Sequence, residues 1–99
     1  MSLEQRRAHR YNYQCQVIVA TNEKSCITEL ENLSKSGCCI WKPADWDFSP
    51  NDVLNLYFVI NNDHVVDVEA MFVWDDGKKI GLQYLQAQLV PIQIADEMK

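Results

Sequence analysis

The arginines of the chain form one group near its N-terminus. Arg6, Arg7 and Arg10 are the only arginines among 99 residues, and Arg6 and Arg10 have the spacing R-x-x-x-R. A guanidinium presents a planar fork of N–H donors that matches the oxygens of a phosphate or the O6/N7 edge of guanine, which a lysine does not reproduce. Residue type and spacing therefore favour an anion clamp, with a solvated basic terminus as the alternative interpretation.

A second polar group, Asn32-x-Ser34-x-x-Gly37, lies in a turn-rich stretch between two predicted strands. Amide and hydroxyl side chains both donate and accept hydrogen bonds, so this group is also suited to a polar ligand. Taken alone, the motif is equally typical of an ordinary turn.

Other kinds of reactive site find little support in the sequence. Histidine occurs only at His9 and His64, and no serine lies in a nucleophile-elbow pattern, so we expect no enzyme. Three aspartates surround Trp46, but the glycine that an EF-hand calcium loop requires is missing and Pro50 interrupts the stretch. The cysteines contain no C-x-x-C pair, which predicts apolar filler residues in a reducing compartment and neither a metal site nor a cofactor. These cysteines are Cys15, Cys26, Cys38 and Cys39.

Charge is unevenly distributed along the chain. The net charge is −5 at pH 7, yet residues 1–10 hold three arginines against Glu4 alone, and the rest holds six lysines against thirteen acidic residues. A general nucleic-acid binder needs a broad basic surface, so this distribution predicts no DNA or RNA partner. No apolar run approaches the ~20 residues of a membrane helix or follows the arginines as in a secretory signal. We therefore expect a cytoplasmic protein without a membrane span.

Apolar and polar residues alternate from Tyr13 to Leu85, a period typical of β-strands. Turn-forming groups at 21–24, 61–63 and 75–77 divide this stretch, and residues 43–52 predict a loop or a single helical turn. The pattern gives six strands: one ending before residue 21, a second from about Ser25, a third over Cys38–Lys42, and three more over 54–60, 66–74 and 79–85.

Six strands around one core predict an all-β, closed or nearly closed antiparallel barrel, because closure removes exposed edges. Pro91 predicts the start of a short C-terminal helix through Met98. The expected organisation is a flexible N-terminal segment, residues 1–12, followed by the barrel domain with its helix, residues 13–99.

Strict alternation also assigns each side chain to one of two faces of its strand. In the second strand it puts Ile27 and Leu33 on one face, opposite Cys26. In the fifth strand it puts Trp74 on the same face as Phe72, which makes Trp74 a core or barrel-rim residue by default.

The arginine group and the N-x-S-x-x-G motif, in this order and ahead of a six-stranded barrel, together resemble those of a PilZ domain, the bacterial receptor module for cyclic di-GMP. The resemblance covers nearly the whole chain, and Ile80-Gly81-Leu82-Gln83-Tyr84 is similar to the family's usual closing strand. The stretch 41–46 and Trp74 are also similar to those of small single-domain members. The resemblance implies a non-catalytic receptor or adaptor that binds cyclic di-GMP and signals to a protein partner.

For the arginines, the resemblance implies that Arg6 and Arg10 contact phosphate and guanine, with Arg7 as an auxiliary. Because like charges at the spacing of Arg6 and Arg10 repel, we expect the segment to be mobile when free and to close over the ligand phosphates. Such closure changes the surface presented to a partner.

For the second motif, the resemblance implies that Asn32 accepts from the Watson–Crick edge of guanine, where the family has Asp or Asn. Its amide has one acceptor oxygen where a carboxylate has two, which predicts weaker or differently arranged recognition. Ser34 adds a hydroxyl for phosphate or base, and Gly37 permits a positive φ or a close approach to the ligand. Trp74 is a further candidate, because an aromatic ring at a strand end stacks well on a base.

Two other functions are compatible with the same barrel. One is a PilZ-like adaptor that has lost nucleotide affinity and works by protein contact alone, which the complete set of motif residues disfavours. The other is a small barrel that binds single-stranded nucleic acid, which the acidic barrel segment disfavours.

Overall fold

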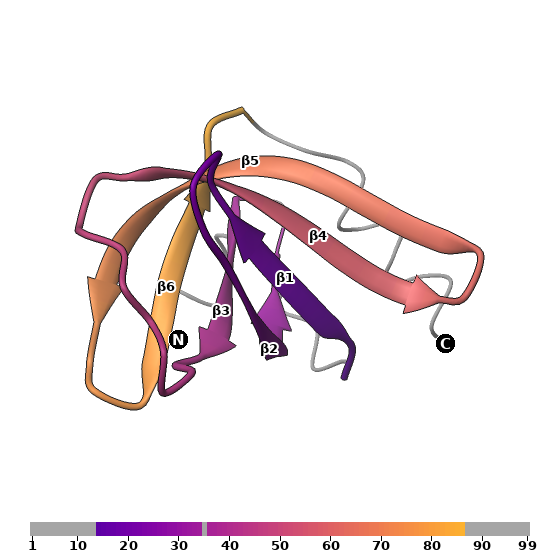
Figure 1. Ribbon diagram of the computed structural model, residues 1–99, viewed down its shortest axis with the longest axis horizontal. Coiled ribbons are helices and arrows are strands. Elements are labelled where there is room, and N and C mark those ends of the chain that lie inside the picture. The colour runs from indigo at the N-terminus through magenta and orange to yellow at the C-terminus, as the bar shows by residue number, and fades with distance from the viewer. Residues whose placement is uncertain (1–13, 35, 87–99) are drawn as a thin grey trace, which may run out of the picture.

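The structure of the protein, a computed structural model, describes residues 14–34 and 36–86 (Figure 1). This part of the chain contains six antiparallel strands, as the alternation predicts, and no helix. The strands are β1 (Gln16–Ala20), β2 (Ser25–Leu33), β3 (Gly37–Trp41), β4 (Val53–Asn61), β5 (His64–Asp75) and β6 (Lys79–Tyr84). The predicted C-terminal helix and arginine-bearing segment lie outside the described residues.

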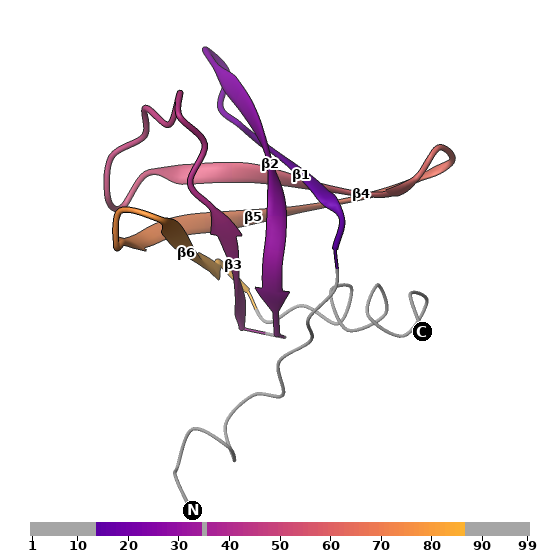
Figure 2. The same cartoon turned by 90° about the horizontal axis from the view of Figure 1, so that it is seen from below.

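The six strands form a closed barrel in the order β1-β2-β3-β6-β5-β4. β4 pairs with β1 to complete the ring, so that Ile18 lies opposite both Ile27 and Tyr57. Residues 42–52 lead from β3 to β4, and β3 pairs with β6 instead of its successor. Figure 2 shows β2 and β3 running across the direction of β4 and β5, so that one sheet folds over itself and encloses a core.

Inward-facing residues of all six strands fill the barrel. Alternation correctly predicts the buried positions of β1, β4 and β6, because each of these strands has one face on the core. Burying each large aliphatic or aromatic side chain contributes roughly 1.5–3 kcal/mol to stability. The fully buried side chains include Val17, Val19, Leu33, Ile40, Leu54, Leu56, Phe58 and Ile80.

The loop between β3 and β4 closes the barrel with two aromatic side chains. Trp46 packs edge-on against Phe48, with ring centroids 4.9 Å apart, and against Phe72, with centroids 5.2 Å apart. Phe48 is itself part of the buried core. The loop therefore adds apolar cover that the strand alternation does not reveal.

Two face assignments based on strict alternation are wrong, each because of a β-bulge. Leu33 is fully buried while Ile27 is 61% exposed, because the pairing of β2 with β3 shifts between Leu30 and Asn32. Trp74 is 45% exposed and does not share the inward face of Phe72, because the pairing of β5 with β6 shifts between these two residues. A bulge adds one residue to one strand, so every later side chain of that strand changes face.

The cysteines are free thiols, three of them buried. Cys26 and Cys38 belong to the core and Cys15 packs against it, as predicted for apolar filler residues. Burial raises the pKa of Cys15 and of Cys26 to about 11, and it also raises the pKa of Cys38, so these thiols stay protonated at neutral pH. Cys39 is buried too but lies outside this core cluster.

Two other kinds of feature are absent from the described part of the chain. No helix there is long and apolar enough to cross a membrane. No group of three His, Cys, Asp or Glu side chains there is placed to hold a metal ion.

Candidate functional site

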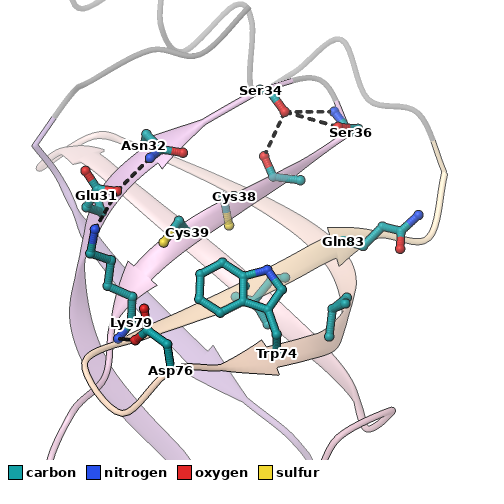
Figure 3. A pocket seen from close by; sticks show the side chains of 14 residues that line it. Glu31, Asn32, Ser34, Ser36, Cys38, Cys39, Trp74, Asp76, Lys79 and Gln83 are labelled. Carbon is teal, nitrogen blue, oxygen red and sulfur yellow. Dashed lines mark hydrogen bonds and ion pairs between the residues drawn. The ribbon is translucent and has the colours of Figure 1, made fainter. Parts of the chain in front are cut away.

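A pocket of about 400 Å³ lies on the outer wall of the barrel (Figure 3). It forms where β2, β3, β6 and the end of β5 lie side by side, which is a consequence of the pairing between β3 and β6. Its lining includes Asn32, Ser34, Gly37 and Trp74, four of the residues that the sequence singles out. The fold therefore brings the second polar motif and Trp74 into one site.

A single row of paired residues crosses the pocket over four strands. Asn32 of β2 lies opposite Cys39 of β3, Cys39 lies opposite Gly81 of β6, and Gly81 lies opposite Trp74 of β5. The bulges in β2 and β5 produce this row, because they turn Asn32 and Trp74 outward. Strict alternation would place both side chains on the opposite face of their strands. The site thus depends on the irregularities of the sheet as much as on the strands themselves.

Gly81 makes room for the indole of Trp74. A Cβ atom at position 81 would lie 2.1 Å from Trp74 Nε1 and 2.2 Å from its Cε2, far inside van der Waals contact. The ring therefore lies flat against the backbone of β6 at the edge of the pocket (Figure 3). A glycine within a strand often marks such a close approach, and this is the signal in the sequence that points to Gly81.

Ser34 organises the turn between β2 and β3. Its Oγ accepts a hydrogen bond from the Ser36 N–H at 3.3 Å and lies 3.3 Å from the Gly37 carbonyl, to which it donates. The Ser34 N–H also donates to the Gly37 carbonyl, at 2.9 Å. The side chain is nearly buried, so the hydroxyl supports the pocket wall from within the turn.

Gly37 serves the close packing of two strands and is not a left-handed turn residue. Its φ is not positive; the glycine with positive φ in the described chain is Gly77, in the β5–β6 turn. A Cβ atom on Gly37 would instead lie 2.3 Å from the carbonyl oxygen of Leu82. The absence of a side chain allows β3 to approach β6 closely at the pocket edge.

The polar lining contains both signs of charge. Glu31 Oε1 accepts a hydrogen bond from Asn32 Nδ2 at 2.6 Å and lies 3.8 Å from Lys79 Nζ. Lys79 Nζ also lies 5.4 Å from the ring centroid of Trp41, a cation–π contact. The backbone N–H groups of Lys78 and Lys79 donate to Asp76, which lowers the pKa of this carboxyl.

Among the described residues that line the pocket, Lys79 is the one cation against the two carboxylates Glu31 and Asp76. An anionic ligand needs more positive charge than this, because it would otherwise face net repulsion. The chain has its arginines at Arg6, Arg7 and Arg10, which lie outside the described residues. Sequence reasoning did not single out Glu31, Lys79, Gly81 or Gln83 as site residues, although all four line the pocket.

The fold and site define the class of this protein: a small closed β-barrel with a polar pocket on its outer wall. The PilZ domain family matches residues 4–96, which is nearly the whole chain. The chain therefore belongs to the PilZ domain family. No curated protein matches the sequence.

Solved structures with the same fold include three bacterial proteins. The motility inhibitor MotI (DgrA) of Bacillus subtilis has a TM-score of 0.71 and 17% identity, over 95% of this chain and 48% of its own. The PilZ domain of CeSA from a cellulose-synthesizing bacterium has a TM-score of 0.69 and 14% identity, over 91% and 93%. The PilZ domain of Escherichia coli YcgR with c-di-GMP has a TM-score of 0.69 and 13% identity, over 95% and 88%. The chain thus spans about half of MotI and most of the other two domains.

Proposed function

We propose that this protein is a non-catalytic receptor for cyclic di-GMP, which binds in the pocket formed by β2, β3, β6 and the end of β5. The observation that carries the proposal is the meeting of Asn32, Ser34, Gly37 and Trp74, from three strands and a turn, in the lining of one pocket. Membership of the PilZ family supports it, as does the similar fold of the YcgR domain solved with c-di-GMP. A pocket of about 400 Å³ also falls in the range of roughly 300–1,000 Å³ typical of small-molecule sites.

In the proposed complex, each residue type has a definite task. Asn32 accepts from the N–H donors of a guanine Watson–Crick edge, and the exposed face of Trp74 stacks on a base. Arg6 and Arg10 provide the cations and forked donors for phosphate and guanine, with Arg7 as an auxiliary. Ser34 contacts the ligand or holds the turn, and Gly37 keeps the pocket edge narrow.

The first test is calorimetric titration of the purified protein with cyclic di-GMP, with GMP and cyclic di-AMP as controls. We expect selective binding at micromolar or lower Kd, because two phosphates and two guanines together provide many charge-assisted hydrogen bonds. The titration also gives the stoichiometry. Absence of heat and of any thermal shift at high ligand concentration would instead favour a PilZ-like adaptor that works by protein contact alone.

The proposed signalling step is closure of the arginine-bearing segment over the bound ligand, which changes the surface offered to a protein partner in the bacterial cytoplasm. Ligand phosphates neutralise the repulsion between neighbouring arginines and so favour an ordered segment. We expect amide hydrogen exchange of residues 4–10 to slow when cyclic di-GMP is added, with residues 61–63 at the β4–β5 turn as an internal control. Equal protection of residues 4–10 with and without ligand would contradict closure.

A further inference from the structure

We infer that Glu31 is a positioning residue that orients the amide of Asn32 for guanine, and that it makes asparagine a better residue than aspartate at position 32 of this chain. The inference rests on the proposed function, because it concerns the specificity of the same pocket. It is carried by the contacts among Glu31, Asn32 and Lys79. Of these residues, only Asn32 belongs to the N-x-S-x-x-G motif.

The contact between Glu31 and Asn32 determines which way the amide faces. A carboxylate accepts hydrogen bonds and does not donate them, so only the Nδ2 end of Asn32 can bond to Glu31 Oε1 at 2.6 Å. Figure 3 shows the amide nitrogen turned toward Glu31 and the oxygen turned away from it. The Glu31 carboxylate therefore leaves Oδ1, the single acceptor of the Asn32 side chain, facing the pocket.

The bulge in β2 makes this contact possible. In a regular strand consecutive side chains point to opposite faces, so positions 31 and 32 would not meet. Here the register shifts between Leu30 and Asn32, and both Glu31 and Asn32 line the pocket. Lys79 on β6, 3.8 Å from the Glu31 carboxylate, in turn holds Glu31 in place and offsets its charge beside an anionic ligand.

As a consequence, Asn32→Asp should weaken binding, although a count of acceptor oxygens alone predicts the opposite. Aspartate has two acceptor oxygens for the N1–H and 2-amino groups of guanine, so Asn32→Asp considered alone gains an acceptor. In this protein, however, the new carboxylate occupies a position 2.6 Å from a Glu31 oxygen. Two carboxylates at such a distance repel, so one must rotate away or take up a proton, and the orientation of the acceptor is lost.

The test compares Kd values for cyclic di-GMP and for cyclic di-IMP, whose hypoxanthine bases lack the 2-amino group. We expect Asn32→Asp to bind cyclic di-GMP about tenfold more weakly than the wild type, the loss of one well-placed hydrogen bond. Adding Glu31→Gln to Asn32→Asp should restore affinity to within about threefold of the wild type, because the new amide donates to the aspartate. Glu31→Ala should lower the preference for cyclic di-GMP over cyclic di-IMP, a readout that a purely structural role does not change.

Glu29→Gln is the matched control, because it removes the same charge from an exposed residue of the same strand outside the pocket lining. It should leave Asn32→Asp as weak as before. Asn32→Asp binding as tightly as the wild type, or rescued equally by Glu29→Gln, would overturn the inference while leaving the proposed function intact. If Asn32→Asp fails to fold, the selectivity of Glu31→Ala decides alone. A wild-type protein that binds neither nucleotide would overturn the proposed function, and the inference with it.

Discussion

Replacing Gly37 with alanine is expected to lower the free energy of unfolding by about 3 kcal/mol, from overpacking together with the loss of strand hydrogen bonds. The new Cβ would lie 2.3 Å from the Leu82 carbonyl oxygen and 3.2 Å from the Gln83 Cα, and both are backbone atoms of a paired strand. Neither atom can move without separating β3 from β6. Replacing glycine with alanine within a strand normally stabilises a protein by roughly 0.5–1 kcal/mol, so a loss of stability at position 37 would itself indicate the steric clash.

A loss of this size is large for a small domain whose total stability is of the order of 5–15 kcal/mol. The midpoint of thermal unfolding should fall by roughly 12–24 °C, measured by far-ultraviolet circular dichroism. Gly81→Ala is the matched control, because its Cβ would collide with the half-exposed ring of Trp74, which can swing into solvent. We expect it to cost under about 1 kcal/mol. Equal losses for both variants would contradict the special role of the β3–β6 approach.

Where each strand faces the core with one side, the sequence alone predicts the fold well. In β4, Leu54, Leu56 and Phe58 alternate with polar or half-exposed residues, and all three are buried. Burial on one face specifies the register of such a strand strongly, because a slip of one residue would expose the whole apolar set. The number of strands and their antiparallel arrangement follow from this pattern and from the turns between them.

The pocket is less predictable from the sequence because it is built where alternation fails. The extra residues at the bulges of β2 and β5 decide that Asn32 and Trp74 reach the same outer wall. A bulge depends on how two strands pair, here β2 with β3 and β5 with β6. The pocket also needs the pairing of β3 with β6, which joins residues about forty positions apart. The motif identifies Asn32 and Ser34 as polar candidates, whereas the roles of Glu31 and Gly81 emerge only from their cross-strand neighbours.

Replacing Arg10 with alanine is expected to weaken cyclic di-GMP binding at least about 100-fold while the barrel remains folded, since the forked contact makes two charge-assisted hydrogen bonds of about 1.5–3 kcal/mol each. The described pocket lining supplies Lys79 against Glu31 and Asp76, so the phosphates depend on cations from elsewhere in the chain. The arginine group is the source that the sequence offers. Calorimetric titration gives the affinity, and circular dichroism verifies that the fold persists.

Two companion variants separate the geometry of the guanidinium from its charge. Arg10→Lys keeps the charge but loses the planar fork, so its affinity should lie between those of Arg10→Ala and the wild type. Lys78→Ala removes one positive charge from the β5–β6 turn, outside the pocket lining, and should change the affinity less than about threefold. If Arg10→Lys binds as well as the wild type, the arginine acts as a point charge and the forked contact to phosphate or guanine is wrong. If Lys78→Ala is as weak as Arg10→Ala, the net charge of the protein, and not the arginine motif, controls binding.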